Sequence, residues 1–159
     1  MNPLYERTTA RCVPAEIEPK LRYRMVEHAQ TYALGDVLHN AVYCFETLSR
    51  RLNPRGRPWW RAVRGLRTER RTAVVITPSH LLIATTGGRR RSTQVRSALL
   101  GGVRLRHSHR KDPEGSGTYV TAPWAGHPSA RFYLEAGGNP DGRALLNELR
   151  WVVDTSWRD

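Results

Sequence analysis

The sequence predicts an α+β fold, an antiparallel β-barrel or sandwich of about six to seven short strands closed by a C-terminal helix. Three observations lead to this prediction. Residues 73–86 hold two apolar runs around a short turn, residues 93–136 alternate strand-like segments with turn residues, and residues 141–157 repeat apolar side chains at helical spacing. A bent antiparallel sheet leaves one end of its core open, and an amphipathic helix can close that end. An N-terminal helical extension is expected to precede this domain.

Size and composition are typical of a folded chain. The 159 residues suit one domain with its own core, and 39% apolar with 25% charged residues argues against global disorder. No apolar run reaches the length of about 18 residues that a membrane span needs, and the N-terminus lacks the apolar segment of a secretory signal. Two cysteines, Cys12 and Cys44, are too few for a disulfide framework. We therefore expect a cytoplasmic protein.

The N-terminal third is expected to be an arm followed by helices. Residues 1–16 carry two prolines among scattered polar residues, which is typical of an extended or poorly ordered arm. A helical extension is predicted over residues 17–56. Its first helix is indicated by apolar residues that recur every three or four positions: Leu21, Met25, His28 or Ala29, and Tyr32.

The second helix of the extension is predicted over residues 36–52, with Asp36 as its N-cap and Asn53-Pro54 at its end. Its apolar residues follow a heptad-like pattern: Leu38, Ala41, Phe45, Leu48 and Leu52. This stripe is too short for a coiled coil. Two interpretations remain open: the stripe packs on the sheet of its own domain, or it forms a surface for a homodimer or another partner.

Residues 73–86 are predicted to form a β-hairpin. The apolar runs 74–76 and 81–83 flank the turn residues Thr77-Pro78-Ser79-His80, where proline presets φ and serine can bond its own backbone. Because both runs are almost continuously apolar, at least one strand is expected to be covered on both faces. An imperfect alternation over residues 60–69 permits a strand with a basic face just before the hairpin.

The remaining elements follow from alternation and turn residues. Strands are predicted over residues 93–96, 103–107, 118–122 and 130–136, with glycine- or proline-containing segments between them. The last helix is predicted over residues 141–157, capped by Asn139 or Asp141. Its apolar stripe consists of Leu145, Leu146, Leu149, Val152 and Val153.

Residues from about 58 to 157 resemble a bacterial pleckstrin-homology-like or GRAM-like domain. The similar stretches are VVITPSHLLIAT, STQVRSALLGGVRLRHSH, and ARFYLEA followed by GRALLNELRWVV. The resemblance implies a PH-like domain over residues 57–159. It also implies that the loop from Gly87 to Ser92 corresponds to the loop that binds anionic lipid head groups in many relatives.

The charge of the chain favours an acidic partner. The formal net charge is +12, from 26 Lys and Arg against 14 Asp and Glu, and only Lys20 and Lys111 are lysines. Such a charge suits nucleic acid, anionic lipid or an acidic protein face. The alternative is that the arginine excess reflects a GC-rich genome and a solvated basic surface.

The candidate binding residues gather in two arginine-rich segments, residues 55–64 and residues 89–91. The tryptophans of residues 55–64 could stack on bases, or could instead be buried at the junction of helix and sheet. Paired glycines and arginines in the second can bind phosphate. The candidates are Arg55, Arg57, Trp59, Trp60, Arg61, Arg64, Arg89, Arg90 and Arg91.

No pattern of catalytic or metal-binding residues stands out. Ser79 and His80 are adjacent in a turn and are expected to face different directions, and no nucleophile-elbow or P-loop motif occurs. Cys44 reads as an inert buried thiol on the second helix. His107 and His109 share one strand face, but two ligands do not make a metal site. We expect no cofactor and no enzymatic activity.

The sequence thus favours a non-enzymatic binding or adaptor module that recognises an acidic protein or an anionic lipid surface through its arginines. The alternative is a nucleic-acid-binding protein with little sequence preference. No recognition helix, zinc finger or RNA-binding motif supports that alternative beyond composition.

Overall fold

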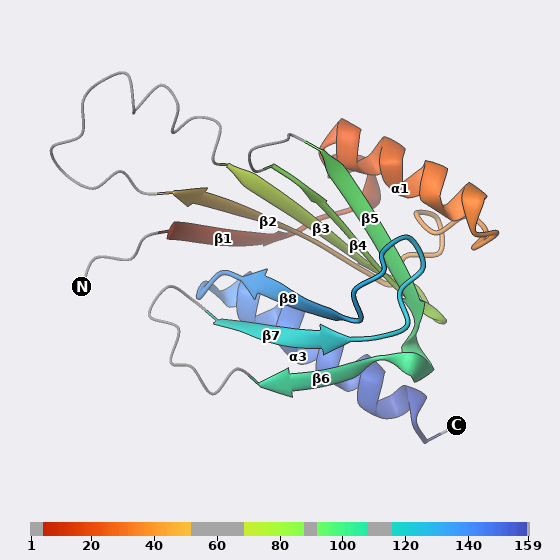
Figure 1. The fold of residues 1–159 in the computed structure, drawn as a ribbon. Coiled ribbons are helices and arrows are strands. Elements are labelled where there is room, and N and C mark those ends of the chain that lie inside the picture. The colour runs from red at the N-terminus through yellow and green to blue at the C-terminus, as the bar shows by residue number, and fades with distance from the viewer. Residues whose placement is uncertain (1–4, 52–68, 88–91, 108–115, 159) are drawn as a thin grey trace, which may run out of the picture.

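The computed structural model describes residues 5–51, 69–87, 92–107 and 116–158 (Figure 1). These residues form two antiparallel sheets, with strand orders β1-β2-β3-β4-β5 and β6-β7-β8, and two α-helices. The elements are β1 (Tyr5–Arg11), α1 (Pro19–Thr31), β2 (Tyr43–Arg51), β3 (Arg70–Ile76), β4 (His80–Thr86), β5 (Thr93–Leu99), β6 (Arg104–His107), β7 (Ser116–Thr121), β8 (Arg131–Ala136) and α3 (Pro140–Ser156). The α+β class is confirmed, and the described strands close no barrel.

Two hydrophobic cores lie on opposite faces of the five-stranded sheet. Figure 1 shows α1 on one side of this sheet, and the three-stranded sheet with α3 on the other. The larger core lies between the sheets and includes Phe45, Leu134 and Leu149. The smaller core lies under α1 and includes Met25 and Leu82. The central strands are therefore buried on both faces.

The predicted hairpin is confirmed as β3 and β4. Ile76 pairs with Leu81 and the Thr77 N–H donates to the His80 carbonyl at 2.9 Å, which closes the predicted turn. Side chains alternate between the two cores along both strands: Val74 and Ile83 belong to the larger core, whereas Val75 and Leu82 belong to the smaller one. This alternation explains why both runs are continuously apolar.

The prediction of a helix over residues 36–52 is wrong, because residues 43–51 form β2 between β1 and β3. Phe45, Thr47 and Ser49 are buried at alternate positions, which is strand periodicity. Phe45 and Leu48, which the helical stripe placed on one face, therefore lie on opposite faces of the strand. Pairing with two neighbouring strands decides the outcome in favour of β-structure. The homodimer surface predicted on that helix therefore has no basis in the described residues.

The N-terminal residues 5–11 are extended, as predicted, but they form an edge strand instead of a free arm. β1 pairs with β2 along its whole length, from Tyr5↔Arg51 to Arg11↔Phe45. Its outer edge is held by side chains that precede and begin α3. Asn139 accepts from the Thr9 N–H at 3.2 Å and donates to the Thr9 carbonyl at 2.6 Å, and Asp141 accepts from the Arg11 N–H at 3.0 Å.

The helices at either end of the chain match their predicted spans closely. In α1, Leu21, Met25, His28 and Ala29 are buried, whereas Tyr32 is the C-cap residue and is exposed. The predicted stripe of α3 is buried except for Val152, which is partly buried. This helix contacts β1 and β2 of one sheet and β7 and β8 of the other. Asn139 occupies its N-cap position but makes no capping bond, because its side chain bonds β1.

The later strands also match, and β5 is three residues longer than predicted because it extends to Leu99. The strand predicted over residues 60–69 lies outside the described residues, apart from residue 69.

Candidate functional site

The binding residues predicted from the sequence all lie outside the described residues, so the structure does not test this prediction. They are Arg55, Arg57, Trp59, Trp60, Arg61, Arg64, Arg89, Arg90 and Arg91. Gly87 and Ser92, the two ends of the predicted phosphate-binding loop, are described, and both line the same cavity.

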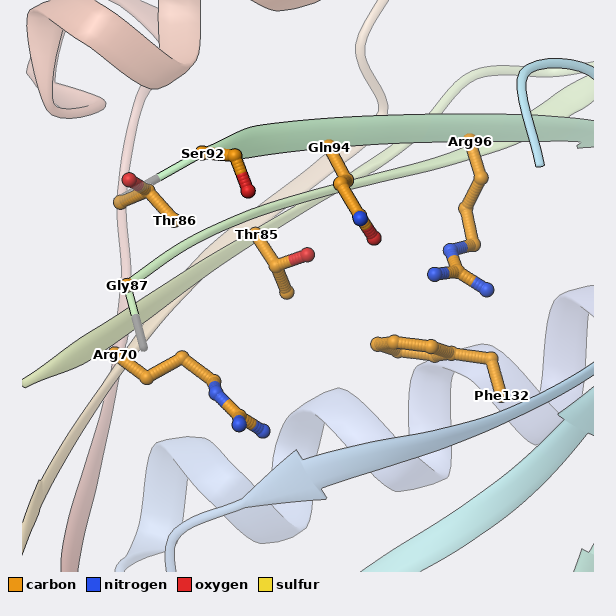
Figure 2. A pocket seen from close by; sticks show the side chains of 8 residues that line it. All are labelled: Arg70, Thr85, Thr86, Gly87, Ser92, Gln94, Arg96 and Phe132. Carbon is orange, nitrogen blue, oxygen red and sulfur yellow. The ribbon is translucent and has the colours of Figure 1, made fainter. Parts of the chain in front are cut away.

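This cavity, which we call the Arg96 cleft, lies between the five-stranded sheet and β8 and has a volume of ≈ 230 Å³ (Figure 2). β3, β4 and β5 supply one wall and the ring of Phe132 on β8 supplies the other. Its lining residues are Arg70, Thr85, Thr86, Gly87, Ser92, Gln94, Arg96 and Phe132.

The cleft is the polar continuation of the larger core. Successive side chains on a strand point to opposite faces, so residues two apart share a face. On β4, Thr85 follows the core residue Ile83, and on β5 the core residue Ala98 is preceded by Arg96 and then by Gln94. The register pairs Ile83 with Arg96 and Thr85 with Gln94. The space between the sheets therefore changes from apolar to polar along these strands.

Arg96 is the central residue of the cleft. It is only 5% exposed, and its guanidinium carbon lies 4.1 Å from the centre of the Phe132 ring and 5.8 Å from that of Trp124. Figure 2 shows its side chain extending from β5 into the space above Phe132. Burial lowers the pKa of Arg96 from its ordinary value, yet an arginine in a protein stays protonated. The cleft thus contains a buried positive charge against an aromatic face.

No residue in the described ranges gives Arg96 a hydrogen bond or a carboxylate partner, and its guanidinium nitrogens are not completely closed off from solvent. Other cations near the cleft are paired: Glu135 lies 3.3 Å from Arg7 and 3.6 Å from Arg70. Aromatic contact compensates only part of the cost of taking a cation out of water. The guanidinium of Arg96 therefore has hydrogen-bond donors that are not used within the described residues.

Hydroxyl and amide groups around Arg96 add hydrogen-bonding capacity. Thr85, Thr86, Ser92 and Gln94 line the same space. Gly87 completes the wall with φ +124°, and a Cβ there would collide with the Glu69 carbonyl and lie 2.9 Å from the Arg70 Cα. Only glycine fits this close approach of β4 to the start of β3.

The size and chemistry of the cleft suit one small oxyanion. Its volume is below the roughly 300–1,000 Å³ of pockets that hold drug-sized ligands. Guanidinium and hydroxyl donors bind phosphate or carboxylate oxygens well. No cluster of three or more histidine, cysteine or acidic residues that could hold a metal occurs among the described residues.

A second cavity of ≈ 320 Å³ lies between α1 and the edge of β5. Arg24 and Glu27 on its rim pair with each other at 2.8 Å. His28 reaches into the protein instead, and its Nε2 lies 2.7 Å from the Oγ of Ser97. Because Ser97 is 1% exposed, this serine–histidine pair holds α1 on the sheet and offers no accessible nucleophile.

Two expectations about reactive side chains were wrong. Ser79 and His80 do not face apart, because the Ser79 Oγ lies 2.8 Å from the His80 Nδ1, within hydrogen-bond distance. Cys44 is buried as predicted, but it lies on β2 and not on a helix, and the Sγ of Cys12 is 3.0 Å from its Sγ. No third group completes a catalytic arrangement at Ser79 in the described residues.

Sequence reasoning missed Arg96 because an arginine within an alternating strand usually points to water. The available signal is the position of Arg96 two residues before Ala98, because alternate residues of a strand share a face and Ala98 is an apolar residue.

No family model matches the chain, and no curated protein or solved structure is significantly similar to it. None of the helices in the described ranges is long and apolar enough to cross a membrane.

Proposed function

We propose that the protein is a non-enzymatic binding module that recognises an acidic partner, either an acidic protein or an anionic lipid surface, and seats one anionic group of that partner in the Arg96 cleft. The observation that carries this proposal is the buried guanidinium of Arg96, which has an aromatic partner but no carboxylate among the described residues. An incoming oxyanion supplies the missing countercharge.

The chain around the cleft supports an acidic partner rather than an isolated ion. Residues 88–91, Gly-Arg-Arg-Arg, connect Gly87 to Ser92, and both of these residues line the cleft. An anionic group held at Arg96 is therefore close in sequence to a dense run of arginines. The net charge of +12 adds long-range attraction for the same kind of partner.

We also propose that the domain is PH-like. Consecutive antiparallel strands β2–β5, a second antiparallel set β6–β8 and a final helix in contact with both sheets support this proposal. β1 and α1 are additions to that arrangement: β1 lengthens the first sheet, and α1 covers its outer face.

The anion site is tested by titrating the full chain with inorganic phosphate in an isothermal calorimeter at constant ionic strength. We expect saturable binding that weakens by about 10- to 100-fold in Arg96→Met, because a charge-assisted hydrogen bond contributes about 1.5–3 kcal/mol. Methionine keeps an unbranched apolar side chain against Phe132.

Arg106→Met is the matched control, because Arg106 is an exposed arginine on β6 that does not line the cleft. It removes the same charge and should leave phosphate affinity unchanged. Equal weakening in both variants would show that only net charge matters and would refute the cleft as a specific site.

The class of partner is tested with the same three proteins. Sedimentation with phosphatidylcholine vesicles, with and without phosphatidylserine, measures lipid binding, and affinity capture from nuclease-treated lysate measures binding to acidic proteins. We expect Arg96→Met to weaken one of these interactions more than Arg106→Met does. Retention of DNA or RNA alone, unaffected by Arg96→Met, would contradict the proposed function and favour a nucleic-acid binder.

A further inference from the structure

The two cysteines of the chain are directly opposed on neighbouring strands. β1 pairs with β2 up to Arg11↔Phe45, and the next residues along are Cys12 and Cys44. The Cys12 N–H donates to the Cys44 carbonyl at 3.0 Å, so the ladder continues through this pair. Their sulfur atoms lie 3.0 Å apart.

This placement satisfies the geometry of a disulfide. Hydrogen-bonded antiparallel partners have Cα atoms about 5.5 Å apart, which falls inside the range of about 4.4–6.8 Å seen in disulfides. An S–S bond is about 2.05 Å long, so closing it requires roughly 1 Å of sulfur movement. Side-chain rotation can supply that movement without separating the strands.

We propose that Cys12 and Cys44 are a redox modification site that forms a reversible intrachain disulfide. The oxidant is a low-molecular-weight disulfide, RSSR. The two thiols differ in access, because Cys44 is 4% exposed and belongs to the smaller core, whereas Cys12 is only partly buried at its rim. Cys12 is therefore the sulfur that meets the oxidant.

The environment of each thiol agrees with this order. The hydrogen bond from the Cys44 thiol lowers the pKa of Cys12, although burial and the nearby Glu46 and Glu16 oppose this effect. The same hydrogen bond, followed by burial, raises the pKa of Cys44. Cys12 is thus the better nucleophile, and Cys44 is the resolving thiol.

The reaction balances in two exchange steps. The Cys12 thiolate attacks one sulfur of RSSR, which forms a mixed disulfide and releases RS⁻. Cys44 then gives its proton to solvent, and its sulfur attacks the Cys12 sulfur and displaces the second RS⁻. Two electrons pass to RSSR, which becomes two RSH, and the protein is left with one S–S bond.

The bond would enclose residues 12–44, which include the short 3-10 helix Pro14–Glu16 and α1. Cross-linking a loop of this size restricts the unfolded chain. We expect the melting temperature to rise by about 10 °C on oxidation.

The test uses the full chain incubated with excess oxidised glutathione, quenched with acid, alkylated and weighed by intact-mass spectrometry. The wild type should become a monomer with no alkylated cysteine and no glutathione adduct, and dithiothreitol should restore both thiols. Cys12→Ser and Cys44→Ser cannot close the bond, so their melting temperatures should not rise with the oxidant.

Three outcomes would overturn the proposal. These are a wild type that keeps two alkylatable thiols, one that stops as a glutathione adduct, and one that forms only disulfide-linked dimers. The wild-type measurement needs no substitution, so it decides the matter even if a serine variant folds poorly.

Discussion

Arg96 and His28 are both buried polar side chains on the five-stranded sheet or against it, but only His28 is satisfied internally. His28 is 8% exposed, and its Nε2 has a hydrogen-bond partner in the Oγ of Ser97. Arg96 is equally buried and has no such bond in the described residues. The aromatic contacts of Arg96 compensate only part of its burial cost, and a buried polar group that is only partly satisfied is typical of a binding site.

Replacing Arg96 should therefore not destabilise the protein. An unpaired buried cation opposes folding, and an apolar side chain of similar length removes that cost while keeping the contact with Phe132. We expect Arg96→Met to unfold in urea with a free energy equal to or above that of the wild type. A loss of more than about 2 kcal/mol would assign Arg96 a structural role instead.

His28 should make stability depend on pH. Burial lowers its pKa in the folded state below the ordinary value of 6.5, so the unfolded chain binds its proton first as the pH falls. The stability contributed by neutral His28 is complete above pH 6.5 and is lost as the pH falls through the folded-state pKa. The loss is at most about 1.4 kcal/mol per pH unit.

Urea unfolding of the wild type and of His28→Gln at several pH values between about 7.5 and about 5 measures this effect, because this range spans the ordinary histidine pKa of about 6.5. The free energy of unfolding should fall less steeply with decreasing pH in His28→Gln than in the wild type. His39→Gln is the control, because His39 is exposed. A slope unchanged in His28→Gln would rule out His28 as its source.

Among the helices and strands, those whose structure is determined by residues close together in the sequence were predicted correctly. The hairpin of β3 and β4 was predictable because its turn and both apolar runs lie within residues 73–86. The strand β2 was not predictable, because it is defined by pairing with β1 and with β3, and 18 residues separate the end of β2 at Arg51 from the start of β3 at Arg70. Its neighbours, not its own spacing, fix its structure.

The candidate site shows the same limit. The sequence predicted binding by arginines and tryptophans of residues 55–64 and by the loop 87–92, and only the two ends of that loop, Gly87 and Ser92, lie in the described residues and line the cleft. The sequence could not select Arg96 among many arginines. The contact with Phe132, 36 residues later in the chain, and the lack of a nearby carboxylate in the described residues are products of tertiary structure.

One side chain before α3 contributes to holding the outer edge of β1. Asn139 bonds both the N–H and the carbonyl of Thr9, a residue that is 1% exposed, so Asn139→Ala leaves two backbone groups without these partners. We expect a loss of about 1–3 kcal/mol in the free energy of unfolding and faster hydrogen exchange at β1 amides.

Asn40→Ala, at an exposed position, is the control and should change the free energy of unfolding by less than about 0.5 kcal/mol. If Asn139→Ala behaved like this control, solvent would be satisfying Thr9 and β1 would be held by β2 alone.

In the whole molecule, the two cores stabilise the fold, and the cleft is the proposed binding site. The smaller core fixes α1 to the outer face of the five-stranded sheet, and the larger core joins both sheets to α3. The cleft opens where the larger core ends, on a chain with a net charge of +12. In the proposed function, the two sheets position Arg96 and the net positive charge adds long-range attraction for an acidic partner.

The central claim is that the guanidinium of Arg96 binds an anion inside the cleft. It is tested most directly by following the Arg96 Nε–H resonance in ¹⁵N NMR spectra while inorganic phosphate is added at constant ionic strength. A saturable shift of that resonance, accompanied by shifts of the Gln94 amide and absent with added chloride, is the predicted result. An Arg96 resonance that stays unmoved while exposed arginines such as Arg106 shift would contradict the account.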